Sequence, residues 1–123
     1  MVEIINDNTK ILHLTLKKKW FDMIASGEKF EEYREMKPYW EKRLCNMAKI
    51  DVGNSIAVFK KYDLICFKNG YAKDAPTMYV NCKGISVGWG EQKWGAESRL
   101  YYIIKLGTIT KIENYGTDRK KKR

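Results

Sequence analysis

Histidine, proline and cysteine are scarce in this chain of 123 residues, which has one histidine, two prolines and three cysteines. Long apolar runs are missing too, because no stretch approaches the ~20 apolar residues that a membrane-spanning helix needs. Residues 1–10 hold acids and amides where a secretion signal would hold an apolar run. We therefore expect a cytoplasmic protein with no membrane partner.

The side chains that commonly bind metals are too widely spread for a zinc site. Cys45, Cys66 and Cys82 form no C-x-x-C pair, and the only histidine is His13. Structural zinc sites usually take their ligands from closely spaced pairs. We expect three reduced, partly buried thiols, no metal site and no other cofactor.

Acidic residues are the minority, with 15 Asp and Glu against 24 Lys and Arg, for a net charge of +9. Residues 119–123 are all basic and, with Asp118, carry +4, which leaves +5 for the other 117 residues. A positive body attracts phosphate, with an affinity that falls as salt rises. Solvated surface charge explains the excess equally well. We expect residues 1–9 to be loose and residues 117–123 to form a disordered basic tail.

The first part of the chain predicts a strand followed by a helix. Three leucines alternate with other residues in 11–16, which is typical of a half-buried strand with His13 on its outer face. Apolar residues at helical spacing predict a helix over 18–26. Gly27 follows directly, at a position where a left-handed residue often ends a helix.

The next part predicts a second strand, a second helix and a loop. The second strand is expected to start near Glu28, and Pro38 suits the first turn of a helix over 38–45. Trp40 has helical spacing and is expected in the core. Residues 47–55 give mixed signals and are expected to form a loop with some irregular structure.

The rest of the chain predicts strands separated by turns. Strands are expected at 62–67 before an Asn69-Gly70 turn, at 77–87 with a bend or bulge at Gly84, and at 100–106, with 108–113 extending the last strand or adding another. Glycine-rich residues 88–98 are expected to form a loop. Five or six short strands with two early helices predict a small α+β domain with a barrel-like sheet, over residues 10–113.

A run of eight residues carries a family resemblance. It reads G-E-K-F-E-E-Y-R from Gly27 to Arg34, and it follows the first predicted helix. The chain resembles the ASCH domain family, named for activating signal cointegrator homology, whose pattern here is G-x-K-x-x-x-x-R. The stretches F-K-N-G-Y at 67–71 and W-G-A-E at 94–97 are similar to a stand-alone bacterial and phage branch of that family. The resemblance covers roughly residues 10–108.

The resemblance implies a PUA-like β-barrel with a cleft whose floor carries the signature residues. Such folds commonly bind RNA or modified bases, so RNA, a nucleotide or a modified nucleoside is the expected partner. Some similar proteins are described as amidohydrolases that cleave acetylated cytidine, and others as ribonucleases. Fold analogy alone does not choose among these functions.

The candidate site is centred on Lys29, Glu32 and Arg34. Lysine makes a mobile point contact to phosphate, and arginine can form two parallel hydrogen bonds to a phosphate or a base edge. Glu32 could keep both cations extended or accept a proton from a base amine. Aromatic faces would stack on bases. The remaining candidate ligand-binding residues are Tyr33, Asn69, Tyr71 and Trp94.

Strand geometry sets a condition on this site. Strict alternation puts Lys29 on the face opposite to Glu32 and Arg34. The three can share a site only if the strand begins after Lys29 or has a bulge near Phe30.

Three functions remain open from the sequence. The first is an RNA- or nucleotide-binding module, and the second is a hydrolase of a modified nucleoside or RNA with Lys29 and Glu32 as catalytic residues. The third is a protein-interaction scaffold. The acetylcytidine-cleaving branch reads G-x-K-x-x-T-x-R, with its lysine thought to activate the threonine, whereas this chain has Glu32 at the threonine position. We therefore expect no acetylcytidine hydrolysis by the threonine route.

Overall fold

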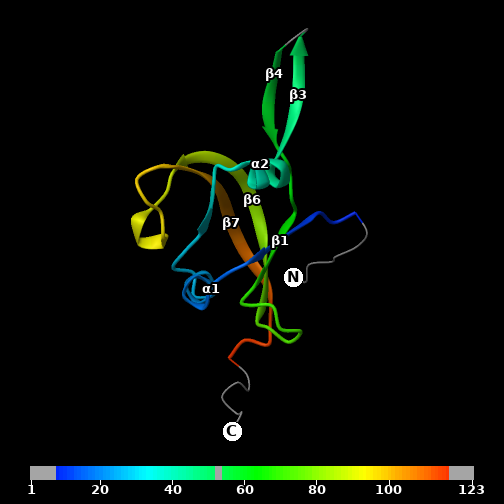
Figure 1. The fold of residues 1–123 in the computed structure, drawn as a ribbon. Coiled ribbons are helices and arrows are strands. Elements are labelled where there is room, and N and C mark those ends of the chain that lie inside the picture. Colours follow the sequence, from blue (N-terminus) through cyan, green and yellow to red (C-terminus); the bar gives the residue numbers. More distant parts are fainter. Residues whose placement is uncertain (1–7, 52–53, 117–123) are drawn as a thin grey trace. The chain divides into compact units, whose positions relative to one another are not determined.

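The computed structural model describes residues 8–51 and 54–116, which form an α+β fold (Figure 1). Within these ranges it has seven strands, two α-helices and one short 3-10 helix. In chain order they are β1 (Ile11–Thr15), α1 (Lys18–Ala25), β2 (Glu31–Glu35), α2 (Pro38–Leu44), β3 (Cys45–Asp51), β4 (Asn54–Phe59), β5 (Leu64–Lys68), β6 (Thr77–Trp89), η1 (Gln92–Trp94) and β7 (Leu100–Glu113). The total of seven exceeds the five or six strands expected, whereas the main sheet has five.

Five strands join in a mixed sheet with the order β1-β5-β6-β7-β2, and β3 and β4 form a separate two-stranded sheet. Strand β1 runs parallel to β5, while β5 pairs with β6, and β2 with β7, in antiparallel fashion. The chain forms two compact units, in which unit 1 is Met1–Phe30, Tyr62–Lys83 and Leu106–Arg123, and unit 2 is Glu31–Lys61 and Gly84–Lys105. Strands β6 and β7 contribute to both units.

The start of unit 1 follows the sequence pattern. The three alternating leucines of 11–16 are buried and His13 is exposed. Helix α1 buries Phe21 and Ile24, and it ends where Gly27 adopts a left-handed φ of 86°. The predicted strand, helix and helix end are confirmed.

The rest of unit 1 is built on β5, the first half of β6 and the end of β7. The Asn69-Gly70 turn is confirmed, because Gly70 has a φ of 104° and the Asn69 N–H donates to the Pro76 carbonyl at 3.0 Å. Residues 108–113 extend β7 rather than adding a strand. Phe30 is the last residue of the first segment of unit 1, and Leu106 is the first residue of its third segment. The Leu106 N–H donates to the Phe30 carbonyl at 3.0 Å, directly before β2 begins.

In unit 2, one prediction made from the local sequence pattern is wrong. Residues 47–55 were expected to form a loop, but 47–51 lie in β3 and 54–55 in β4, two antiparallel strands that pair Cys45 with Phe59 and Asp51 with Asn54 (Figure 1). The prediction was wrong because each strand is stabilised by hydrogen bonds to the other, which the mixed side-chain pattern does not reveal.

Two further boundaries in unit 2 differ from the expectation. Strand β6 continues through Gly84, whose φ is 135°, and ends at Trp89, so the predicted loop over 88–98 begins later and contains η1. Helix α2 begins at Pro38 as predicted.

Some expectations fall outside the described residues, namely those on residues 1–7 and on the basic tail at 117–123. Among the residues that are described, no helix is both long and apolar enough to span a bilayer.

Candidate functional site

Glu32 and Arg34 form a nearly buried ion pair in unit 2. They lie two residues apart in β2, so their side chains share one face of the strand. The Arg34 Nη2 atom donates to Glu32 Oε2 at 2.8 Å, and the exposed fractions of the two side chains are 17% and 9%. The structure thus brings two of the three central signature residues together.

The guanidinium of Arg34 also lies on an aromatic ring, because its Cζ atom is 4.9 Å from the centroid of Trp40. The Cζ atom of Arg43 lies 5.4 Å from the same centroid and 5.7 Å from that of Tyr39. The rings of Tyr39 and Trp40 meet at 4.8 Å with an interplanar angle of 86°. We call Arg34, Tyr39, Trp40 and Arg43 the α2 array.

Sequence reasoning placed Trp40 in the core and left Arg43 out of the site. Trp40 is instead half-buried, with the guanidinium groups of Arg34 and Arg43 near its ring. The available signal was the spacing of Tyr39 and Arg43, which are four residues apart in a predicted helix and therefore neighbours on its surface. Arg43 Nη1 donates to the Tyr39 hydroxyl at 3.3 Å.

Lys29 belongs to unit 1, where it is almost fully buried at 2% exposure. Its N–H donates to the Met23 carbonyl at 3.0 Å, and its Nζ atom lies 5.5 Å from the centroid of Trp20. Strand β2 begins at Glu31, after Lys29. The first of the two conditions for a shared site is therefore met, since strand alternation does not govern the direction of the lysine.

Tyr33 anchors a loop of unit 2. Its hydroxyl donates to Glu31 Oε1 at 2.8 Å and accepts the Glu91 N–H at 2.9 Å, and its ring lies 5.7 Å from that of Tyr101. Burial raises the pKa of Tyr33 well above its ordinary value of 10.0, although the Glu91 N–H acts in the opposite direction. The contacts of the Tyr33 hydroxyl therefore connect β2 to the loop after β6.

The other three candidate residues occupy different surroundings. Trp94 is buried in unit 2, within η1, and the Lys93 Nζ atom lies 5.0 Å from its ring centroid. Asn69 and Tyr71 belong to the turn after β5 in unit 1, where Tyr71 is 91% exposed. The structure groups Glu32 with Arg34, and it places Lys29, Asn69 and Tyr71 in the other unit.

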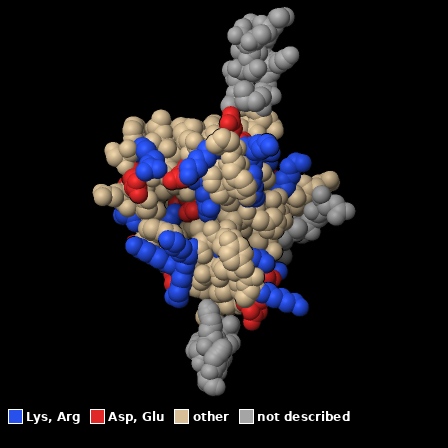
Figure 2. Space-filling view, viewed as in Figure 1, with Lys and Arg blue, Asp and Glu red and all other residues tan. Residues whose placement is uncertain are grey.

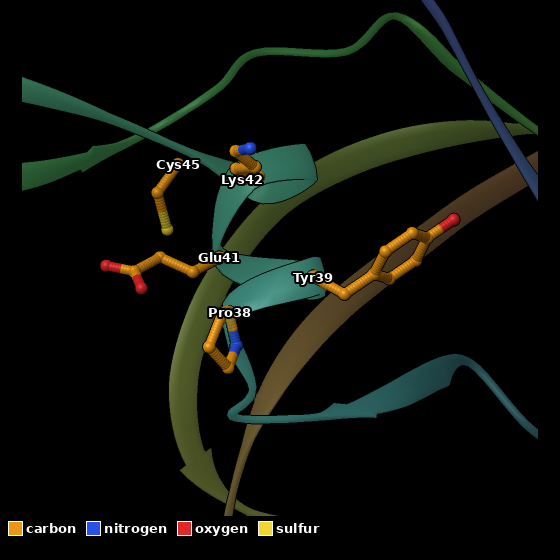
Figure 3. Close-up of a pocket in the computed structure, with 5 residues that line it drawn as sticks. All are labelled: Pro38, Tyr39, Glu41, Lys42 and Cys45. Atoms are coloured by element: carbon orange, nitrogen blue, oxygen red, sulfur yellow. The ribbon is translucent and has the colours of Figure 1, made fainter.

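A pocket of about 500 Å³ lies beside α2 (Figure 3). Its lining residues are Pro38, Tyr39, Glu41, Lys42 and Cys45. Figure 3 shows Glu41 and Cys45 on the same side of the helix, while the ring of Tyr39 points away from both. Tyr39 therefore belongs to the rim of this pocket and directs its ring toward another part of the surface.

A second pocket of unit 2, of about 310 Å³, lies along the loop after β6. It is lined by Trp89, Gly90, Gln92, Ala96, Glu97 and Ser98. The Trp89 ring is well exposed there, whereas Trp94 of the same loop is buried. The two tryptophans of this glycine-rich segment thus have opposite environments.

The thiols and charges of the described residues show no metal centre. None of Cys45, Cys66 and Cys82 is in a disulfide bond, and burial raises the pKa of Cys66. No group of three or more His, Cys, Asp or Glu residues in the described part of the chain could hold a metal ion. Figure 2 shows Lys and Arg side chains spread over the face in view, with acidic side chains among them.

No protein-family model, curated protein or solved structure matches this chain.

Proposed function

We propose that the protein is an RNA- or nucleotide-binding domain of the ASCH type, with a PUA-like barrel and a site built on its G-x-K-x-x-x-x-R signature. The observation that carries the proposal is the Glu32–Arg34 pair, nearly buried and backed by the Trp40 ring. Charged side chains are rarely buried unless they are paired. A pair of this kind costs desolvation energy, so it is weak evidence for stability.

The arrangement of Arg34 suits recognition of phosphate or a base edge. Its guanidinium group is planar and presents its donors in a fixed fork that matches such ligands. Glu32 Oε2 accepts a hydrogen bond from Arg34 Nη2 at 2.8 Å, and the centroid of the Trp40 ring lies 4.9 Å from Arg34 Cζ. A ligand would therefore meet an arginine whose side-chain freedom is already restricted, which reduces the entropy lost on binding.

Lys29 enters the proposal through the signature and its burial. A lysine with 2% exposure is unusual, because removing an ammonium group from water is costly. Lysine side chains are almost never fully buried unless they are paired. The net charge of +9 would draw polyanions toward the site.

The test compares Arg34→Ala with substitutions of two exposed lysines. Lys37 pairs with Glu35 and Lys18 pairs with Asp22, both at 2.7–2.8 Å on the surface. Removing the contact of Arg34 should cost ~1.5–3 kcal/mol of binding free energy, because a hydrogen bond to a charged group is lost. That corresponds to roughly 10- to 150-fold weaker binding. Lys37→Ala and Lys18→Ala should each change affinity by less than about threefold, as expected for exposed ion pairs.

The measurement is fluorescence anisotropy with short single-stranded RNA, together with calorimetry for mononucleotides, at one fixed salt concentration. Arg34→Lys keeps the charge but loses the planar fork, so it should bind nearly as weakly as Arg34→Ala. Thermal unfolding of every variant shows that the fold is retained. Equal, small losses in all three alanine variants would reduce the site to general surface charge.

A further inference from the structure

We propose that the α2 array is a stacking platform for one base of a single-stranded RNA, so that the ligand is a strand and not a free mononucleotide. The inference rests on the proposed function and adds to it a second contact surface. Its central residue is Tyr39, which lies in the first turn of α2 and is 60% exposed. An aromatic ring in this position is available to a partner from solvent.

Two neighbouring side chains orient the ring of Tyr39, and the residue is still exposed to solvent. Trp40 meets it nearly perpendicularly at 4.8 Å between centroids. Arg43 lies 5.7 Å from the Tyr39 centroid and donates to the Tyr39 hydroxyl at 3.3 Å. Figure 3 shows the ring extending away from Glu41 and Cys45. A base stacking on an already oriented ring loses little binding energy to ordering that side chain.

The charges around the ring favour a nucleic acid strand. Arg43 contacts both aromatic rings, and Lys42 lies three residues after Tyr39 in the same helix, so two cations lie near the exposed ring. Single-strand binding sites combine cations that follow the backbone with aromatic faces on which bases stack. An acidic peptide would use the cations but would have no need of an exposed aromatic face.

The array is continuous with the signature pair. Arg34 contacts both Glu32 and Trp40, and Trp40 contacts Tyr39, so one chain of contacts leads from the ion pair to the exposed ring. All of these residues belong to unit 2. A ligand that engages Arg34 at one end and Tyr39 at the other must extend past Trp40. In the proposed arrangement one nucleotide of a strand engages Arg34 and a neighbouring base stacks on Tyr39, so a mononucleotide held at Arg34 makes no use of Tyr39.

The experiment measures the binding of uridine monophosphate and of a mixed-sequence RNA hexanucleotide to the whole chain. Tyr39→Ala should weaken hexanucleotide binding by on the order of tenfold, the loss expected for one stacked base. The same variant should bind uridine monophosphate as the wild type does. Tyr39→Phe keeps the flat ring and should stay within about threefold of wild type, while Tyr39→Leu keeps apolar bulk without the flat ring and should bind as weakly as Tyr39→Ala.

The controls separate this inference from the proposed function. Arg99→Ala removes an exposed arginine of the same unit that pairs with Glu97 and Glu35, and it should leave both affinities unchanged. Loss of binding in Arg34→Ala but not in Tyr39→Ala would leave the proposed function standing and overturn the platform. No binding of either ligand to the wild type would overturn both. Equal competition by a polyglutamate peptide, with no effect of Tyr39→Ala on RNA binding, would identify an acidic protein partner instead.

Discussion

Tyr33 and Arg34 are consecutive residues of β2, and their side chains lie on opposite faces of the strand. Arg34 lies with Glu32 against Trp40, whereas Tyr33 receives the Glu91 N–H and holds the loop after β6. Strand alternation separates the two roles within two consecutive residues. A substitution at Arg34 therefore tests the proposed ligand binding, whereas one at Tyr33 tests loop anchoring, and the two effects can be measured independently.

Ionisation of the Tyr33 phenol is expected to lower the stability of the fold at alkaline pH. Because burial raises its pKa above 10.0, the native state keeps a proton that an unfolded tyrosine loses. This contribution to stability is complete below about pH 10 and is lost as the pH rises through the native-state pKa. We expect the Tm of the wild type to fall above about pH 10 and that of Tyr33→Phe to fall less steeply.

Thermal unfolding from about pH 8 to 11 measures both curves. Burial also raises the pKa of Tyr79 and of Tyr102, so part of the slope should remain in Tyr33→Phe. Parallel curves for the two proteins would show that Tyr33 keeps no proton that the unfolded chain gives up.

Glu32 decides which chemistry the signature can support. If the chain is of the proposed ASCH type, a carboxylate already ion-paired with Arg34 at 2.8 Å occupies the position at which the acetylcytidine-cleaving branch has a threonine. Attack on an amide by this carboxylate would form an anhydride and expel a poor leaving group. We expect no release of cytidine from acetylcytidine by the wild type, measured by mass spectrometry. Efficient turnover by the wild type would refute this expectation and favour the hydrolase alternative.

The variant Glu32→Thr extends that measurement. It restores the G-x-K-x-x-T-x-R pattern at the signature, so activity gained only in this variant would show that Glu32 alone prevents the threonine route. Because the substitution removes the partner of Arg34, its Tm should be measured alongside. Activity in neither protein would agree with a binding module.

At the scale of elements, close packing joins β2 to the loop after β6. A Cβ atom added at Gly90 would lie 2.7 Å from the Cζ atom of Tyr33 and 2.7 Å from the Cβ atom of Ala96. These distances are shorter than real contacts, so the loop or the Tyr33 ring must shift. Glycine at this position therefore permits the hydrogen bond between Glu91 and Tyr33.

We expect Gly90→Ala to destabilise the fold by ~1–3 kcal/mol, the usual cost of overpacking. Gly88→Ala is the matched control, because its added Cβ would meet only the flexible Cδ1 end of Ile103, at 3.2 Å. Chemical denaturation measures both free energies of unfolding. Equal stability of the two variants would show that the Tyr33 ring yields to the added methyl group without cost.

At the scale of the whole molecule, charge is shared between the body and the basic tail. Residues 118–123 lie outside the described residues, and they carry +4 of the net +9. We expect their deletion to weaken RNA binding and to flatten the dependence of affinity on salt, because fewer counterions are released. The Tm should remain almost unchanged. Anisotropy titrations at several salt concentrations give the slope.

A full-length control replaces the five tail cations with glutamine. It should behave as the deletion does if charge alone matters. An unchanged salt slope in both proteins would show that the tail makes no phosphate contacts, and a large loss of Tm in the deletion would show that it stabilises the fold.

The sequence alone determined the local elements whose signals lie within a few residues. Alternating leucines predicted β1, Gly27 predicted the end of α1, and Pro38 predicted the start of α2, because backbone dihedral preferences and amphipathic periods act locally. The signature also singled out Glu32 and Arg34, whose pairing two residues apart follows from strand geometry. The two-residue spacing of Glu32 and Arg34 therefore predicts this part of the candidate site.

The tertiary structure decided what depends on partners distant in the chain. The hairpin of β3 and β4 exists through its cross-strand hydrogen bonds, which mixed side chains over 47–55 did not indicate. Trp40 is half-buried beside Arg34 and Trp94 is buried, although their local patterns suggested a core residue and a loop residue. Burial of an aromatic side chain depends on which elements pack against it, and the sequence pattern of a single element does not contain that information.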